Sequence, residues 1–112
     1  MNKINLLITG SNGMVGRSLL KKILKKRKYK VLKPSSNELD LMNKNSIRKY
    51  LLKNKPTHII HLASYVGGIN ASLTDPINFI YKNIIISQNL IYESHLMKIK
   101  NFINLGSSCI YP

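Results

Sequence analysis

Three glycines spaced three residues apart form the stretch of this sequence whose chemical use is clearest. Gly10, Gly13 and Gly16 follow the apolar run 4–9 and precede a segment with helical periodicity. At this spacing one glycine permits a tight turn, a second lets the backbone approach a phosphate, and a third lets the new helix pack on the strand. The N–H groups at the start of that helix face the bound anion. The sequence therefore predicts a phosphate site at residues 10–16, within a strand, turn and helix.

The cysteine and histidine residues predict no metal site. Cys109 is the only cysteine, so no intrachain disulfide can form. A lone cysteine is more often a small buried apolar residue than a reactive one. His58 and His61 lie three residues apart on a predicted strand, so their side chains point to opposite faces and do not share a ligand. We predict structural roles for both, and for the isolated His95.

Strand and helix patterns that alternate along the chain would position these residues. The expected strands are 4–9, 29–33, 57–63 and 101–105, and the expected helices are 15–28, 43–54 and 76–97. This order requires parallel strands joined by right-handed crossovers, which is a doubly wound α/β sheet. The small-residue loop 64–72 follows the third strand at the edge where ligands of such folds bind.

Apolar residues at helical spacing define the helix faces that we expect to be buried. In the first helix they are Val15, Leu19, Leu20, Ile23 and Leu24. In the last helix they are Ile77, Ile80, Ile84 and Ile91. Asn43 or Asn45 is expected to cap the middle helix.

Length and charge bound the class of protein. At 112 residues the chain is long enough for one small domain and too short for a nucleotide domain followed by a substrate domain. No helix covers its fourth predicted strand, so we expect residues 1–112 to be the truncated N-terminal part of a larger protein.

The formal net charge of the chain is +14. The lysines accompany many Asn and Ile residues, and the chain has no arginine cluster interleaved with aromatic residues. We therefore favour a solvated basic surface over nucleic-acid binding. No apolar run is long enough to span a bilayer or to serve as a signal peptide, so a cytoplasmic location is expected.

The glycine turn and three further motifs resemble the extended short-chain dehydrogenase/reductase family. The further motifs are Val66-Gly67-Gly68-Ile69, Phe79-Ile80-Tyr81-Lys82-Asn83 and Gly106-Ser107-Ser108-Cys109-Ile110-Tyr111-Pro112. The resemblance runs along the whole chain and is closest to members that epimerise and then reduce a nucleotide sugar with NADPH. It implies a Rossmann-like sheet with the strand order 2-1-3-4.

The resemblance implies two catalytic residues. Ser107 would hydrogen-bond the keto oxygen of the sugar, in a Ser, Tyr, Lys set that protonates this oxygen when hydride arrives from NADPH. Cys109 would remove the acidic proton beside the ketone, a task that suits a thiol whose pKa is brought near neutrality. The tyrosine and lysine of the set normally lie four residues apart on a later helix. Tyr29 and Lys33 have this spacing but lie on a strand, where they do not converge. The chain alone is therefore expected to be inactive.

The resemblance also implies the cofactor and its contacts. NADP is favoured over NAD because residues 33–36 offer no acidic side chain for the ribose 2′-hydroxyl. Two interpretations of Lys33 stay open: it supplies a positive charge for the 2′-phosphate, or it points into solvent. Asp40 and Leu41 resemble the adenine contacts of the family. Ala63, Ser64 and Val66 would lie alongside the ribose. The whole expected contact set is Gly10, Ser11, Asn12, Gly13, Met14, Val15, Gly16, Lys33, Asp40, Leu41, Leu62, Ala63, Ser64, Val66 and Leu105.

The expected partner is a nucleotide-sugar substrate, with neither nucleic acid nor membrane. The resemblance implies a homodimer for the full-length protein. Three alternatives stay open: another nucleotide-sugar epimerase or dehydratase of the same superfamily, a non-catalytic nucleotide-binding module, and a basic nucleic-acid binder whose affinity would fall steeply with salt.

Overall fold

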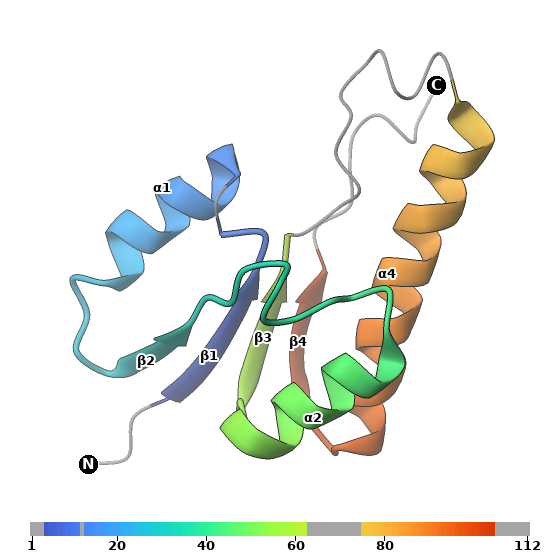
Figure 1. Cartoon of the computed structure of the whole chain (residues 1–112). Helices are drawn as coiled ribbons and strands as arrows, with labels where there is room; N and C mark the ends of the chain where they lie inside the picture. Colours follow the sequence, from blue (N-terminus) through green and yellow to red (C-terminus); the bar gives the residue numbers. More distant parts are fainter. Residues whose placement is uncertain (1–3, 12, 63–74, 105–112) are drawn as a thin grey trace.

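The computed structural model describes residues 4–11, 13–62 and 75–104. It contains, in chain order, β1 (Ile4–Thr9), α1 (Met14–Ile23), β2 (Tyr29–Leu32), α2 (Lys44–Asn54), β3 (His58–His61), α4 (Pro76–Leu96) and β4 (Asn101–Asn104). The strands pair in parallel in the order β2-β1-β3-β4, as Figure 1 shows. The predicted Rossmann-like sheet and its strand order are therefore confirmed.

β1 is a central strand that buries side chains on both faces of the sheet. Leu7 is in register with Leu32 of β2 and with Ile59 of β3. Leu6 and Ile8 point to the opposite face, and both are buried as well. A parallel strand between two layers of helices requires apolar residues on both faces, which explains the uninterrupted apolar run in this part of the sequence.

Helices cover both faces of the sheet, as Figure 1 shows. α2 and α4 pack on one face, where the buried core consists of Leu7, Leu39, Ile47, Leu51, Ile59 and Leu90. α1 packs on the other face, where Ile23 contacts the cluster of Leu6 and Ile8. The carboxyl ends of β1 and β3 therefore lie between two helical layers, at the edge of the sheet where the glycine turn begins.

α1 is shorter than predicted and buries fewer of the expected residues. It ends at Ile23, because the chain turns at residues 24–28 to enter β2. Val15 and Leu24 were expected to be buried but are 57% and 61% exposed. The prediction is wrong for both, since Gly16 is the buried residue of the first turn and Leu24 lies after the last helical residue.

α4 buries a different face from the one predicted. Ile77, Ile80, Ile84 and Ile91 are 81%, 53%, 58% and 44% exposed, so the predicted core face of this helix is wrong. The residues that are buried are Ile86, Asn89, Leu90, Glu93 and Ser94.

Polar partners explain why this face of α4 is buried. Glu93 is 1% exposed, and its carboxylate accepts hydrogen bonds from Arg48 of α2 at 2.9 and 3.4 Å. The side-chain amide of Asn89 donates to the carbonyl of Leu41 at 3.0 Å. Polar groups are buried without a large penalty when they are paired in this way. Apolar content alone therefore does not identify the inward face of this helix.

Candidate functional site

The glycine turn joins β1 to α1 at the carboxyl edge of the sheet (Figure 1). Gly10 has a φ angle of 74°, in the left-handed region that favours glycine. Its carbonyl accepts a hydrogen bond from the N–H of Gly13 at 3.1 Å, which closes the turn. The turn therefore needs glycine at its first position.

Gly16 lets the first turn of α1 lie directly on this loop. A Cβ at this position would lie 2.5 Å from the carbonyl oxygen of Gly10 and 2.6 Å from the Cα of Ser11. Both distances are far inside van der Waals contact, and both partners are backbone atoms that cannot swing aside. Any larger residue would push the helix away from the end of β1.

Among the described residues, Gly13 meets no such steric limit. Its φ of −73° and ψ of 172° are open to any residue. A Cβ here would meet the carbonyl oxygen of Gly10 at 3.4 Å, which is an ordinary contact, and the residue is exposed. A ligand that approaches the backbone would give a reason for glycine at this position.

The N-terminus of α1 has no side-chain cap and no acidic residue in its first turn. α2 differs, because the side-chain oxygen of Asn43 accepts from the N–H groups of Asn45 and Ser46 at 2.9 and 3.2 Å. The sequence left Asn43 and Asn45 open as caps of this helix, and Asn43 is the one that caps it. The N-terminus of α1 therefore offers its terminal N–H groups and the positive end of the helix dipole to solvent or to an anion.

Two further predicted contact segments lie at the same edge of the sheet. Leu62 directly follows β3, and its N–H donates to the carbonyl of Thr9, the residue before Gly10, at 3.0 Å. Asp40 and Leu41 lie on the segment that joins β2 to α2, which crosses the upper ends of the central strands in Figure 1. The structure thus places Leu62 beside the residue that precedes the glycine turn, and the 40–41 segment against α4, where Leu41 accepts a hydrogen bond from Asn89.

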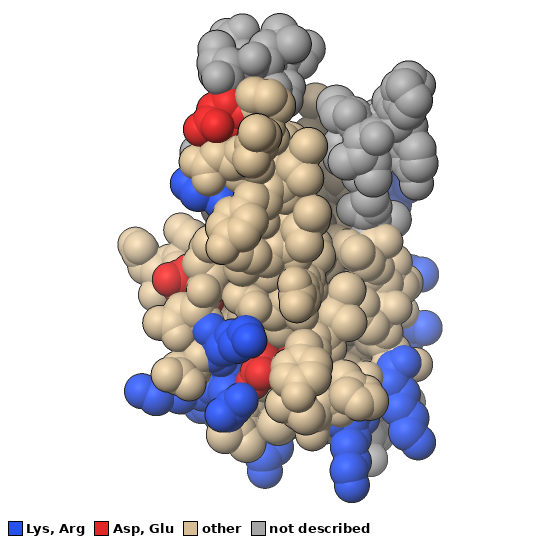
Figure 2. Space-filling model, turned by 90° about the vertical axis from the view of Figure 1, so that its right-hand side faces the viewer, with Lys and Arg blue, Asp and Glu red and all other residues tan. Residues whose placement is uncertain are grey.

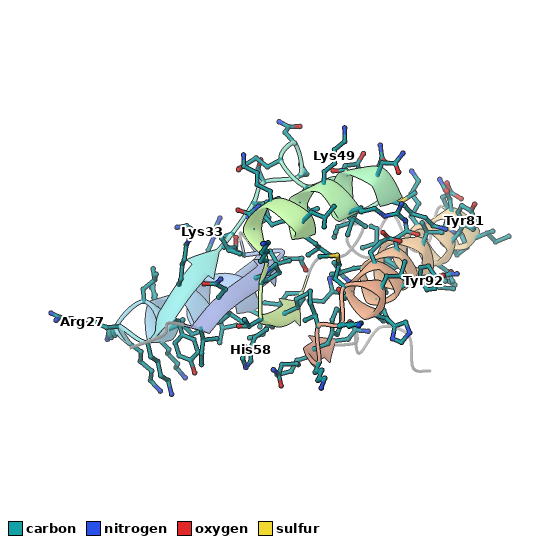
Figure 3. The ribbon with its side chains drawn as sticks, turned by 90° about the horizontal axis from the view of Figure 1, so that it is seen from below. Arg27, Lys33, Lys49, His58, Tyr81 and Tyr92 are labelled. Carbon is teal, nitrogen blue, oxygen red and sulfur yellow. The ribbon has the colours of Figure 1, made fainter. Side chains whose placement is uncertain are left out.

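Lys33 lies beside α2. Together with Glu38, Lys49, Tyr50 and Lys53 it lines an open groove between the end of β2 and this helix. Figure 3 shows Lys33 and Lys49 on the side of the sheet that α2 covers. The structure therefore groups Lys33 with the lysines of α2 rather than with the glycine turn.

Several predicted site residues lie outside the described residues: Asn12, Ala63, Ser64, Val66, Leu105, Ser107 and Cys109. Their roles stay predictions. Within residues 4–11, 13–62 and 75–104, no group of three His, Cys, Asp or Glu side chains is placed to hold a metal ion. In the same ranges no helix combines the length and the apolar character needed to cross a membrane.

A buried hydrogen-bond network lies under the glycine turn, and the sequence did not indicate it. Nδ1 of His61 lies 2.6 Å from the hydroxyl of Thr9, and Nε2 lies 3.2 Å from the hydroxyl of Ser87 on α4. His61 is 1% exposed. Burial lowers its pKa to about 4, so the imidazole is neutral near pH 7. The signal is the register of the sheet, which pairs Thr9 with His61 and is known only once the strands are aligned.

Known proteins resemble this chain over nearly all of its length. A model of the NAD dependent epimerase/dehydratase family matches residues 6–112. GDP-L-colitose synthase from Yersinia pseudotuberculosis is 42% identical over 109 residues, and GDP-L-fucose synthase from Azorhizobium caulinodans is 38% identical over 107 residues. These matches cover 97% and 96% of this chain but 35% and 34% of the relatives, so the chain spans about a third of their length.

A solved structure has the same arrangement of strands and helices. It is MlghC, a GDP-mannoheptose C4 reductase from Campylobacter jejuni with NADP bound. The TM-score is 0.87 at 28% identity, and the match covers 100% of this chain and 35% of that one.

Acid should destabilise the fold through His61. Its native pKa of about 4 lies below the ordinary value of 6.5, so the unfolded chain binds this proton more readily. The free energy of unfolding should therefore fall as the pH drops from 6.5 towards 4, by on the order of 3 kcal/mol from this group, and be fully retained above 6.5. Urea unfolding across this range measures the effect.

The variant His61→Asn should show a flatter dependence of stability on pH. The same substitution at the exposed His95 is the control, because it removes a histidine without touching the network. A dependence as steep in His61→Asn as in the unmodified chain would contradict a buried neutral imidazole.

Proposed function

The chain belongs to the NAD dependent epimerase/dehydratase family, and on that premise we propose that it is the N-terminal, NADP-binding part of a GDP-L-fucose synthase. Such an enzyme epimerises GDP-4-keto-6-deoxy-mannose and then reduces it to GDP-L-fucose. The similarity to a GDP-L-fucose synthase over 96% of the chain supports this assignment. We assign residues 1–112 to the cofactor domain, and the substrate domain to sequence beyond them.

The observation that carries the cofactor assignment is the difference between the three glycines. The fold requires Gly10 for its positive φ angle and Gly16 for its close backbone contact. Gly13 is exposed and has room for a Cβ. A pyrophosphate approached by backbone N–H groups supplies the missing reason for glycine there. Residues 10–16 would hold this pyrophosphate at the N-terminus of α1, and bound NADPH supplies the hydride for the reduction.

The residues after β2 favour NADP over NAD. Enzymes that prefer NAD usually carry an acidic residue there, which hydrogen-bonds the ribose 2′-hydroxyl and repels a 2′-phosphate. Residues 33–36 are Lys-Pro-Ser-Ser. The solved relative MlghC has NADP bound, which supports the same choice here. Lys33 is exposed, and its long side chain would have to turn from the groove beside α2 to reach the phosphate.

For the chemistry we propose Ser107 and Cys109. Ser107 would hydrogen-bond the 4-keto oxygen, and Cys109 would remove the proton beside the ketone. The tyrosine and lysine of the set would come from sequence beyond residue 112. Tyr29 and Lys33 do not form this pair, because Tyr29 packs in the core under α1 and Lys33 lines the groove beside α2. The chain alone would then bind the cofactor without converting the sugar.

A second candidate is a related GDP-sugar synthase. The identity to GDP-L-colitose synthase is 42%, against 38% for the GDP-L-fucose synthase. A segment that binds mainly the cofactor discriminates little between sugars, so this candidate differs from the first only in its substrate.

α4 presents an apolar stripe on the side that faces away from the sheet. Its exposed residues are Ile77, Ile80, Tyr81, Ile84, Ile91, Tyr92 and Leu96. Their spacing places them on one side of the helix. Figure 2 shows this side of the molecule, with most of its lysine and arginine towards the lower part and a mainly tan surface above them, interrupted at the upper left by one basic and one acidic group. Exposed apolar areas of this kind mark interaction surfaces.

We propose that the full-length protein is a homodimer and that a second copy covers this stripe. Each chain carries a net charge of +14, so two copies approach at least cost where basic side chains are absent. An antiparallel pair of α4 helices about a twofold axis near residue 86 sets Ile80 against the partner's Tyr92, and Tyr81 against the partner's Ile91. Apolar residues then meet apolar residues in both halves of the interface.

Substituting two of the glycines should separate the ligand from the fold. Gly13→Ala should leave the free energy of unfolding within about 1 kcal/mol of the unmodified chain. It should weaken NADPH binding by about tenfold or more, because the methyl group occupies the approach of the pyrophosphate. Gly16→Ala should instead lower stability by about 1–3 kcal/mol through steric overlap. Urea unfolding and fluorescence titration with NADPH measure the two effects, and undiminished affinity in Gly13→Ala would count against the cofactor site.

The longer protein that contains this chain should consume NADPH and form GDP-L-fucose from GDP-4-keto-6-deoxy-mannose. Cys109→Ser should lower the rate of product formation by about 100-fold or more, the typical contribution of a general base. Product analysis by chromatography is the measurement. A protein that leaves this substrate unreduced would favour a related GDP-sugar, and a downstream sequence without Tyr-x-x-x-Lys would sink the assignment.

Charging the stripe of α4 should dissociate the dimer. Ile84→Lys places an ammonium group in the middle of the proposed interface, so the dissociation constant should rise by about 100-fold or more. Sedimentation equilibrium of the full-length protein measures it. Leu52→Lys is the control, because Leu52 is an exposed apolar residue on α2, outside the stripe. Equal association of both variants would remove α4 from the interface.

A further inference from the structure

α4 reaches the predicted cofactor segments through two polar side chains that the proposed function does not use, the half-buried Ser87 and the buried Asn89. Ser87 contacts His61 next to the glycine turn, and Asn89 contacts the loop between β2 and α2. His61 and Asn89 are 1% and 5% exposed. Packing alone does not call for polar groups in these positions, since apolar residues of similar size would fill the same space at lower cost.

The first contact is part of a chain of hydrogen bonds. The N–H of Leu62 donates to the hydroxyl oxygen of Thr9 at 3.2 Å, in addition to its bond to the Thr9 carbonyl. That hydroxyl shares a hydrogen bond with Nδ1 of His61, 2.6 Å away. The other ring nitrogen, Nε2, shares one with the hydroxyl of Ser87 at 3.2 Å, and in the neutral ring one nitrogen donates while the other accepts. The ring thus links β1 and β3 to α4.

This chain of bonds ends at the residue from which the glycine turn starts. Thr9 is the last residue of β1, and Gly10 follows it with its positive φ angle. The sheet register and the network both pair Thr9 with His61. A shift of the His61 ring would therefore displace the end of β1 and, with it, the peptide groups of the turn.

The second contact holds the segment in which the adenine contacts are expected. Asn89 Nδ2 donates to the carbonyl of Leu41 at 3.0 Å. The backbone N–H of the neighbouring Asp40 donates to the hydroxyl of Ser46 at 3.0 Å. This segment is neither helix nor strand, so its position depends on such contacts rather than on a repeating ladder of backbone bonds.

We propose that α4 sets the shape of the cofactor site through two positioning residues, His61 for the glycine turn and Asn89 for the adenine segment. The inference rests on the proposed cofactor function. Neither residue touches the cofactor in this scheme, because His61 acts through Thr9 and Asn89 acts through Leu41. The two sites of action are separate, so each residue should affect a different part of the ligand.

Fragments of the cofactor test this separation. Ser87→Ala removes the hydrogen-bond partner of Nε2 of His61, and Thr9→Val removes the partner of Nδ1. Both should weaken binding of NADPH and of ADP, which carries a pyrophosphate, by about three- to tenfold, the factor that one hydrogen bond supplies. Both should leave binding of adenosine 2′-phosphate, which has no pyrophosphate, unchanged. Thr9→Ser keeps the hydroxyl and should restore the affinity for ADP.

Asn89→Leu should show a different pattern. It keeps the volume of the side chain but removes the donor to Leu41, so adenosine 2′-phosphate and NADPH should both bind about three- to tenfold more weakly. Ser94→Ala is the matched control for both positions. Ser94 is buried on the same helix, and its hydroxyl has no hydrogen-bond partner among the described residues.

Calorimetric titration of the 112-residue chain and its variants provides the affinities, and urea unfolding corrects them for any unfolded fraction. The inference is overturned if Ser87→Ala and Asn89→Leu bind all three ligands as Ser94→Ala does, or if each variant weakens all three by one common factor. If Asn89→Leu does not fold, Asn89→Asp replaces it, because it keeps the size of the side chain and removes the donor.

Amide hydrogen exchange keeps the test independent of the proposed function. An unmodified chain that binds none of the three ligands would refute the cofactor assignment. Ser87→Ala should still speed exchange at residues 10–16 relative to Ser94→Ala, because the turn loses its anchor to α4. Equal exchange in these two variants would refute the positioning role by itself.

Discussion

The close contact between the first turn of α1 and the backbone at residues 10–11 is the constraint on which the rest of this structure depends. A Cβ at position 16 would lie only 2.5 Å from the carbonyl oxygen of Gly10, so only glycine fits at this position. The contact fixes where α1 starts and holds its N-terminus over the end of β1. It also sets the direction from which Ile23 reaches the core beneath the helix. The electrostatics of the site follow from this steric fit, since the helix N-terminus cannot face the gap unless the helix begins here.

The two helical layers meet the sheet in different ways. α1 packs on its face through an apolar cluster that includes Ile23, whereas α4 combines an apolar cluster around Leu90 with three buried polar groups. Glu93 pairs with Arg48 of α2, and the carboxylate raises the pKa of the guanidinium through this hydrogen bond. A buried carboxylate without a partner would be costly, so this pair holds α2 and α4 in one relative position. Apolar contact fixes the depth of α4 on the sheet, and the polar groups fix its register.

The topology was predictable from the sequence because strand and helix patterns differ in period, and because parallel strands allow few connections. The cap at Asn43 was predictable for a similar reason, since its chemistry is local. The inward face of α4 was not, because Ile84 and Ile91 are as apolar as Ile86, and only tertiary contacts show which of them is buried. The His61 network was hidden for the same reason, because its members come from residues 9, 61 and 87. Contacts between residues far apart in the sequence therefore cannot be predicted from local patterns in a single sequence.

Gly13, which the described part of the fold does not require to be glycine, is the strongest indication of a ligand at this turn. Gly10 and Gly16 have full structural explanations, so neither by itself argues for a ligand. Gly13 has ordinary backbone angles, an exposed position and room for a methyl group, and replacing it by alanine would lower the entropy of the unfolded chain. Stability alone thus favours a larger residue here. That glycine is present nonetheless is explained when an anion lies against its backbone, at a helix N-terminus for which the described residues supply no side-chain cap.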